Sequence, residues 1–298
     1  MLESISGSYL TYILQNEDED KKIEKILYRR FHFSRKLIQK IKIGENAWLD
    51  GKFVFLNTRG SAGQTLTVNI LTGELSTIEG ENGPIDILFE DDLFLAVNKL
   101  PGQTVHPTLR YPSGTLANAV VGYWERKNEF RPFRPISRID RNTSGIVLVA
   151  KTRFAHQQLA WQAGKNQVEK KYLGIVQGQF PKDCGEFSSP IALQQGSKIK
   201  REINEKGQTA LTLFRVLLRH KNYSLMEFTL VTGRTHQIRV HCQGSGYPLL
   251  GDDLYGGDMS YIQRQALHCS SYSFMHPLKQ ERINIGVSLP EDMRLLLD

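Results

Sequence analysis

The sequence predicts an α+β protein in which strands and helices do not alternate regularly. Only two helices, at residues 115–124 and 152–163, are expected after residue 85, against several strands of unequal spacing. Few regular crossovers favour α+β over a doubly wound parallel sheet. With 298 residues and 40% hydrophobic side chains, the chain can form one large domain and a small one. The expected strands of the large domain are 146–150, 172–176, 209–216 and 224–231.

Positive charge is concentrated near the N-terminus. Residues 1–20 are polar and carry an acidic cluster at 17–20, and we expect them to be an N-terminal extension. Residues 21–43 hold nine basic side chains and one acidic one, a balance of +8, whereas the remainder of the chain has 29 basic and 30 acidic groups. Such a patch predicts a polyanionic partner, with a solvated helical face as the alternative.

Two short helices and a hairpin are expected in and after this basic segment. Ile23, Ile26 and Leu27 recur at helical spacing, Ser34 can cap a second helix, and Gly44 suits its end. The dipeptide at 50–51, Asp-Gly, is a strong hairpin signal. The helix pair would display six cations, Arg29, Arg30, Arg35, Lys36, Lys40 and Lys42.

This order of elements resembles the S4-like RNA-binding module. The runs Ser-Arg-Lys-Leu-Ile at 34–38 and Gly-Lys-Phe-Val at 51–54 match its typical pattern. The resemblance implies a small α/β RNA-binding module over residues 21–75, although a generic helix pair would look similar. Residues 76–84 are then expected to be a linker, and a second domain is expected over 85–298.

The second domain is expected to open with two strands. Ile85, Ile87 and Phe89 alternate as in a half-buried strand, the two aspartates at 91–92 can form a turn, and residues 93–97 form a more buried strand.

The densest polar cluster of the second domain is the run at 137–145, which directly precedes the apolar strand at 146–150. A polar loop that enters a buried strand is a place where a rigid scaffold can hold reactive groups. Asp140 lies between Arg138 and Arg141, and arginine pairing would keep a carboxylate ionised and oriented. The alternative is a turn aspartate that accepts a backbone hydrogen bond from Asn142 or Thr143.

The whole run resembles the active-site motif of the RluA-type pseudouridine synthases, commonly Arg-Leu-Asp-x-x-Thr-Ser-Gly before an apolar strand. Ile139 replaces the usual leucine, and Leu100 replaces a proline of an earlier family motif. Further matches follow in the family's order and together span residues 85–290. They lie at 98–107, 115–119, 171–178, 232–241, 251–256, 267–268 and 276–277.

The resemblance implies roles for individual residues. Asp140 matches the essential aspartate. Tyr172 matches the aromatic residue packed against the flipped uracil, with a core aromatic on a strand as its alternative. Arg234 matches the arginine that pairs with the catalytic carboxylate, with a surface cation before a helix as its alternative. Arg138 matches a residue that helps to displace the base, with a structural salt bridge as the rival interpretation. Ile238 would line the uracil pocket, with core packing as its alternative. The expected substrate-binding set is completed by Arg141, Thr143 and His106.

The resemblance also implies the fold and the activity: a mixed, largely antiparallel central sheet, and isomerisation of uridine to pseudouridine in structured RNA without a cofactor. Large-subunit ribosomal RNA is the expected substrate, and transfer RNA is the alternative. Two other classes are alternatives. One is a catalytically inactive RNA-binding assembly protein, and the other is a hydrolase that pairs Asp140 with Asp252 or Asp253.

Several other classes are disfavoured by composition. Cys184, Cys242 and Cys269 form no CxxC pair, which argues against a disulfide framework or a cysteine-rich zinc site. His236 and His241 lack the spacing and the third ligand of a zinc motif, so no metal is expected. Without a signal peptide or a membrane-length apolar run, the sequence predicts a cytoplasmic monomer that binds no membrane.

Overall fold

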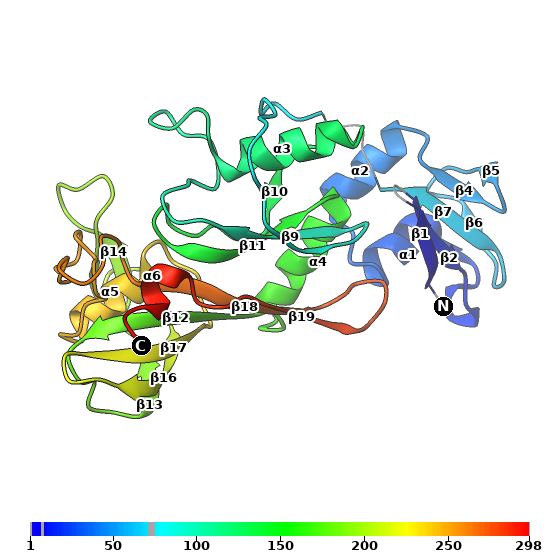
Figure 1. Ribbon diagram of the computed structural model, residues 1–298. Coiled ribbons are helices and arrows are strands. Elements are labelled where there is room, and N and C mark those ends of the chain that lie inside the picture. The colour runs from blue at the N-terminus through cyan, green and yellow to red at the C-terminus, as the bar shows by residue number, and fades with distance from the viewer. Residues whose placement is uncertain (1, 7–8, 71–74, 298) are drawn as a thin grey trace.

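The computed structural model describes residues 2–6, 9–70 and 75–297, and Figure 1 shows a small N-terminal sheet at one end of a long central sheet. The N-terminal sheet has the strand order β1-β2-β7-β4-β5. Its strands are β1 (Leu2–Ser6), β2 (Tyr9–Ile13), β4 (Ala47–Leu49), β5 (Lys52–Phe53) and β7 (Thr65–Asn69). Beside it lie a 3-10 turn (Asn16–Asp18), the paired strands β3 (Lys21–Lys22) and β6 (Arg59–Gly60), and the helices α1 (Ile23–Arg29) and α2 (Arg35–Ile43).

The helix pair and the hairpin form where the sequence predicted them. The Ser34 hydroxyl accepts a hydrogen bond from the backbone N–H of Leu37 at 3.2 Å, which caps α2. Asp50 and Gly51 both have positive φ, as a tight two-residue hairpin turn between β4 and β5 requires.

The predicted extension at 1–20 is not separate from the sheet. Strand β2 pairs antiparallel with β7 along its length, and β1 pairs with β2. Leu10, Tyr12 and Leu14 are buried, so this segment does alternate between apolar and polar side chains. The alternation covers few residues beside a strongly acidic cluster, which is why the sequence pattern alone gave little signal.

The central sheet has the order β13-β16-β17-β12-β18-β11-β9-β8, with β10 paired to β11 and β19 paired to β18. Among the described strands, only β11 and β18 pair parallel, which confirms the predicted mixed, largely antiparallel sheet. The strands are β8 (Ile87–Glu90), β9 (Phe94–Lys99), β10 (Arg134–Pro135), β11 (Ser144–Ala150), β12 (Glu169–Gln177), β13 (Cys184–Phe187), β16 (Thr212–Arg219), β17 (Tyr223–Leu230), β18 (Leu267–Met275) and β19 (Arg282–Gly286).

The remaining elements are four helices and a hairpin. They are α3 (Leu116–Arg126), α4 (Arg153–Gly164), α5 (Gln237–Gly244), α6 (Glu291–Arg294) and the strands β14 (Ile191–Leu193) and β15 (Arg201–Ile203). Figure 1 shows that α5 and this hairpin lie at the end of the central sheet opposite the N-terminal sheet. No helix among the described residues is both long and apolar enough to cross a membrane.

The short parallel junction between β11 and β18 depends on a glycine. Gly145 pairs with Cys269 and has a φ of 105°. A Cβ atom at this position would lie 2.2 Å from the carbonyl oxygen of Cys269, so only glycine permits the approach. The junction fixes the start of β11, and Asp140 lies four residues before it.

The N-terminal elements are docked on α4 through an aromatic segment. The rings of His32 and Trp161 stack with centroids 4.2 Å apart, and Phe33 packs against Phe154. The predicted linker is also held, since the backbone N–H of Glu81 donates to a carbonyl oxygen of α3 at 2.9 Å. The N-terminal elements and the linker at Glu81 are therefore both held against helices of the central part.

Candidate active site

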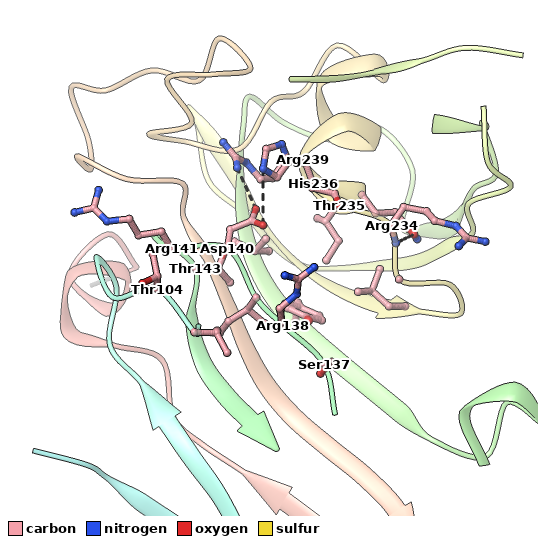
Figure 2. Close-up of a pocket in the computed structure, with 18 of the residues that line it drawn as sticks. Thr104, Ser137, Arg138, Asp140, Arg141, Thr143, Arg234, Thr235, His236 and Arg239 are labelled. Carbon is pink, nitrogen blue, oxygen red and sulfur yellow. Dashed lines mark hydrogen bonds and ion pairs between the residues drawn. The ribbon is translucent and has the colours of Figure 1, made fainter. Parts of the chain in front are cut away.

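A cavity of about 750 Å³ opens above the parallel junction of the central sheet. Most of its lining comes from residues 104–108, 136–141 and 233–239. The rest comes from Thr143, Lys170, Tyr172, Ile199, Leu230 and Leu267. Figure 2 shows that the labelled arginines and Asp140 gather around this cavity. The segments 104–108 and 233–239 are more than 100 residues apart in sequence and nevertheless meet in one site.

Asp140 presents its carboxylate to the cavity. Its backbone carbonyl oxygen accepts the N–H of Thr143 at 3.1 Å, so the backbone forms the turn that precedes β11. Its carboxylate instead contacts the side chains of Arg239 and His236, and 26% of the Asp140 side chain is exposed. A turn aspartate would accept backbone N–H hydrogen bonds with its carboxylate. The Asp140 carboxylate contacts side chains instead, so this alternative does not fit the structure.

The guanidinium that contacts Asp140 belongs to Arg239, and the prediction that Arg234 makes this contact is wrong. Arg239 Nη1 donates to Asp140 Oδ2 at 3.0 Å. Through Nε and Nη2, Arg239 also donates to both carboxylate oxygens of the fully buried Asp252, at 2.8 and 2.7 Å. Burial alone would lower the pKa of Arg239, but Asp252 and then Asp140 raise it above its ordinary value.

Arg234 lies on the other side of the turn that begins α5. Its Nε donates to the carbonyl oxygen of Thr209 at 3.0 Å, and its side chain is exposed at the rim of the cavity. His236 adopts a left-handed conformation with a φ of 58° immediately before the helix. Arg234 precedes this residue and Arg239 lies in the helix after it, and the two side chains project in different directions (Figure 2). Motif spacing could not reveal this difference in direction.

Tyr172 and Ile238 form apolar walls of the cavity. Both side chains are buried, and they come from β12 and α5. Burial raises the pKa of Tyr172 well above its ordinary value, so its hydroxyl keeps its proton. An aromatic ring and an aliphatic side chain beside a carboxylate suit a flat ligand such as a pyrimidine.

The other predicted substrate-binding residues also line the cavity. Arg138 is exposed and points into it (Figure 2). Arg141 donates through Nε to the carbonyl oxygen of Gly102 at 2.8 Å and lies over the ring of Tyr111. His106 stacks near Phe133. Thr143 is buried and accepts a hydrogen bond from Gln265, so it supports the Asp140 loop from below.

Lys99 holds two of the cavity loops together. Its ammonium donates to the carbonyl oxygens of Leu100, Gln103 and Arg141 at 2.7 to 2.9 Å. Burial lowers the pKa of Lys99 to about 7. Lys99 lies in the family motif at 98–107, and the resemblance implies no role for it. A nearly fully buried lysine at the end of a strand is a signal that such a role exists.

The two histidines that could have suggested a metal have other partners. His241 contacts Thr212 Oγ1 through Nδ1 and the carbonyl oxygen of Ser189 through Nε2. His236 contacts the hydroxyl of Tyr255 through Nδ1. Across the described ranges, no cluster of three or more His, Cys, Asp or Glu side chains could hold a metal ion.

The second acid of the hydrolase alternative does not face Asp140 as a free carboxylate. Asp252 is fully buried, and both of its oxygens accept hydrogen bonds from Arg239. Asp253 is exposed. The arrangement therefore offers one accessible carboxylate with an oriented guanidinium rather than a pair of acids flanking a substrate.

Comparison with known proteins identifies the family. The family model for RNA pseudouridylate synthase matches residues 93–244. The uncharacterised RNA pseudouridine synthase YjbO of Bacillus subtilis is 37% identical over 89% of this chain and 94% of its own. Ribosomal large subunit pseudouridine synthase D of Buchnera aphidicola is 32% identical over 93% of each chain.

A solved structure shares the fold. The human RNA Pseudouridylate Synthase Domain Containing 1 protein superposes with a TM-score of 0.58 at 24% identity, over 70% of this chain and 85% of its own. The motifs, the site and these similarities agree. The chain belongs to the RNA pseudouridylate synthase family and is an RNA pseudouridine synthase.

Proposed function

We propose that this enzyme isomerises uridine to pseudouridine in large-subunit ribosomal RNA, with Asp140 as its essential carboxylate. The observation that carries the proposal is the Asp140 carboxylate at 3.0 Å from Arg239, in a cavity walled by Tyr172. The substrate is supported by relatives named ribosomal large subunit pseudouridine synthase D, one of which covers 93% of this chain at 32% identity. Transfer RNA is the second candidate.

The reaction requires three events at one nucleotide. The bond between the sugar and base nitrogen 1 breaks, the uracil turns while it is held, and base carbon 5 bonds to the same sugar carbon. Atoms balance without a redox or energy input. Asp140 acts either as nucleophile at that sugar carbon or as the base that takes a sugar proton, and both routes need a carboxylate oriented at the sugar.

The cavity residues support a uridine that has left its stack. Extrusion of a base from folded RNA costs a few kcal/mol. The buried ring of Tyr172 provides a stacking surface for the uracil, and Ile238 closes the pocket beside it. Arg138 occupies the place of the displaced base, and Arg234 binds RNA at the rim. His106 and Arg141 hold the neighbouring backbone.

The N-terminal part of the chain supplies affinity for RNA as an S4-like module. Arg29, Arg35 and Lys36 are exposed and serve as phosphate contacts. Arg30 and Lys42 also make ion pairs within the module, with Glu17 and Glu24 at 2.8 and 2.7 Å. Lys40 belongs to the same basic face of α2. The enzyme acts as a monomer in this proposal.

The test is tritium release from RNA labelled at uracil carbon 5. Wild-type enzyme releases tritium from a large-subunit ribosomal RNA transcript and not from a pool of transfer RNA. Asp140→Asn and Asp140→Ala abolish release while RNA binding, measured by filter retention, persists. Release that survives in both variants removes Asp140 from the mechanism. Release from transfer RNA alone reverses the substrate assignment.

Substrate assignment in cells needs a separate measurement. Pseudouridines mapped in total RNA from cells with and without the gene should differ at uridines of the large-subunit ribosomal RNA. A difference confined to transfer RNA would contradict the proposed substrate, and no difference in any RNA would favour an inactive assembly protein.

A further inference from the structure

Tyr255 contacts three parts of the active site, and the reaction described above gives this residue no role. It is buried, and its hydroxyl accepts a hydrogen bond from the backbone N–H of Arg201 at 2.9 Å. The same hydroxyl lies 2.9 Å from Nδ1 of His236, and the Arg239 guanidinium lies 5.0 Å above the tyrosine ring. One side chain therefore joins the β14–β15 hairpin to both residues that contact Asp140.

The hydroxyl proton of Tyr255 fixes the protonation of His236. A tyrosine hydroxyl has one proton to donate, and its oxygen already accepts from Arg201. Within the described part of the chain, His236 Nδ1 is the acceptor that the structure places beside this hydroxyl. If Nδ1 carried the proton instead, the buried hydroxyl would lose that acceptor, which costs about 1–3 kcal/mol. Nδ1 is therefore unprotonated.

The pKa values of both groups agree with this assignment. Burial raises the pKa of Tyr255 above its ordinary value, so the phenol keeps its proton. Burial lowers the pKa of His236, and the charges of Arg239 and Arg201 act in the same direction against those of Asp140 and Asp252. The imidazole is thus neutral at pH 7. A neutral ring without a proton on Nδ1 carries its proton on Nε2.

The Nε2 atom of His236 faces the carboxylate of Asp140. It lies 3.8 Å from Oδ1, which is too long for a hydrogen bond but close enough for the N–H dipole to act on the charge (Figure 2). Arg239 donates to the other oxygen, Oδ2. With the proton on Nε2, each carboxylate oxygen of Asp140 faces an N–H group, Oδ1 that of His236 and Oδ2 that of Arg239. With the proton on Nδ1, the lone pair of Nε2 would face Oδ1 and repel it.

We propose that Tyr255 is a positioning residue that holds His236 in its Nε2–H tautomer and thereby orients the Asp140 carboxylate for the reaction. This inference rests on the proposed role of Asp140. Arg201 anchors the hydroxyl because its own strand β15 pairs with β14. Ile199, in the loop of the same hairpin, lines the cavity, so the anchor lies beside the cavity.

The rival interpretation is that Tyr255 only packs the core. Its ring does belong to a small apolar cluster with Ile191, Ala210 and Val240. The variant Tyr255→Phe separates the two roles, because it keeps the ring, its packing and its contact with Arg239 and removes only the hydroxyl. Tyr261→Phe is the matched control, since the hydroxyl of Tyr261 accepts from Asn222 at 3.1 Å on the exposed surface.

The first measurement is the tautomer itself, which does not depend on activity. Nitrogen NMR of protein labelled with ¹⁵N-histidine reports which ring nitrogen carries the proton, and His236→Gln identifies the signal by its loss. We expect the Nε2–H form in wild type and in Tyr261→Phe, and a mixture of tautomers in Tyr255→Phe. An Nδ1–H form in wild type, or an unchanged signal in Tyr255→Phe, would overturn the proposal.

The second measurement is a kinetic cycle. We expect Tyr255→Phe to lower kcat for tritium release about tenfold with KM changed less than twofold, as loss of an outer hydrogen-bond partner does at other sites. In a His236→Ala background the same change should have no further effect, since the hydroxyl acts through the imidazole. Two outcomes would contradict the positioning role of Tyr255. One is a double variant in which the two losses of kcat multiply, and the other is a Tyr255→Phe variant in which only KM rises.

A failure of the proposed function would be recognised separately. If Asp140→Asn keeps its activity, the carboxylate is not essential to the reaction. The tautomer of His236 then has no catalytic role, even if the NMR result is as expected. If Asp140→Asn is inactive and Tyr255→Phe has wild-type kcat, only the positioning role is lost.

Discussion

Arg239 Nη1 lies 3.0 Å from Asp140 Oδ2, although the two residues are 99 positions apart in the chain. The other edge of the same guanidinium makes a bidentate contact with Asp252, which is fully buried. One carboxylate thus fixes the arginine, and the arginine orients the other carboxylate. The exposed acid of this triad is the one that faces the cavity.

Substitution of Arg239 should be far more damaging to activity than substitution of Arg234. Arg239→Lys keeps a positive charge but loses the planar fork that joins the two carboxylates, and we expect kcat to fall about 100-fold through misplacement of Asp140. Arg234→Lys, the matched control, should change kcat less than threefold because Arg234 contacts Thr209 at the rim. Equal losses would show that Arg234 also acts on the carboxylate.

Arg239→Ala should lower the free energy of unfolding. It leaves the buried Asp252 carboxylate without its partner, and removal of one member of a buried ion pair costs about 3–5 kcal/mol. Urea unfolding should show a drop of this size. The double variant Arg239→Ala/Asp252→Asn should recover a substantial part of the lost free energy of unfolding. A double variant as unstable as Arg239→Ala would contradict this explanation.

Tyr172 should act through its ring. Tyr172→Phe keeps the stacking surface and should retain activity within about threefold, whereas Tyr172→Leu keeps apolar volume without an aromatic ring. Loss of base stacking is worth about 1–3 kcal/mol, so kcat/KM of the leucine variant should fall roughly 5- to 150-fold. Thermal unfolding of both variants serves as the control for folding. Similar activities for Phe and Leu would argue against stacking.

The exposed cations of α2 should determine the salt dependence of RNA binding. For each phosphate contact removed, the slope of log K against log salt should become about one unit less steep. Arg35→Gln combined with Lys36→Gln should therefore reduce the slope by about two units. Lys182→Gln, an exposed lysine before β13 at the far end of the central sheet, is the control. An unchanged slope in the double variant would count against the module.

Acid should destabilise the fold through His268. Burial and the charge of Arg264 lower its pKa to about 4, whereas an unfolded histidine titrates near 6.5. Between these values the unfolded chain binds a proton at His268 that the native state does not. The contribution of His268 to the free energy of unfolding is therefore complete above pH 6.5 and is lost as the pH drops toward 4. The contribution is about 3 kcal/mol in total.

A matched pair of variants isolates this effect. His268→Gln should flatten the fall of the urea-derived free energy of unfolding between pH 6.5 and 4, whereas His220→Gln, at an exposed position, should behave as wild type. His268 sits at the parallel junction beside Ser144, so the acid effect reports on the scaffold of the site. Identical pH profiles for wild type and His268→Gln would refute the assignment.

Local patterns predicted most of the elements. The cap at Ser34, the hairpin at Asp50 and Gly51, and the buried strand that follows the Asp140 loop all form as expected, because each depends on a few neighbouring residues. The segment at 9–13 was missed, since a strand of five residues carries a weak pattern and is defined by its pairing with β7.

The family, the α+β class and the presence of Asp140 and Tyr172 in motifs of fixed order can all be read from the sequence. Which groups act together depends on the folded chain. The partner of Asp140 is Arg239 rather than Arg234, because the left-handed His236 separates the two arginines and only Arg239 lies in α5, which places its guanidinium at the carboxylate. The link from Tyr255 through His236 likewise exists only in three dimensions, since contacts between distant segments follow from the folded path of the chain and not from the spacing of its residues.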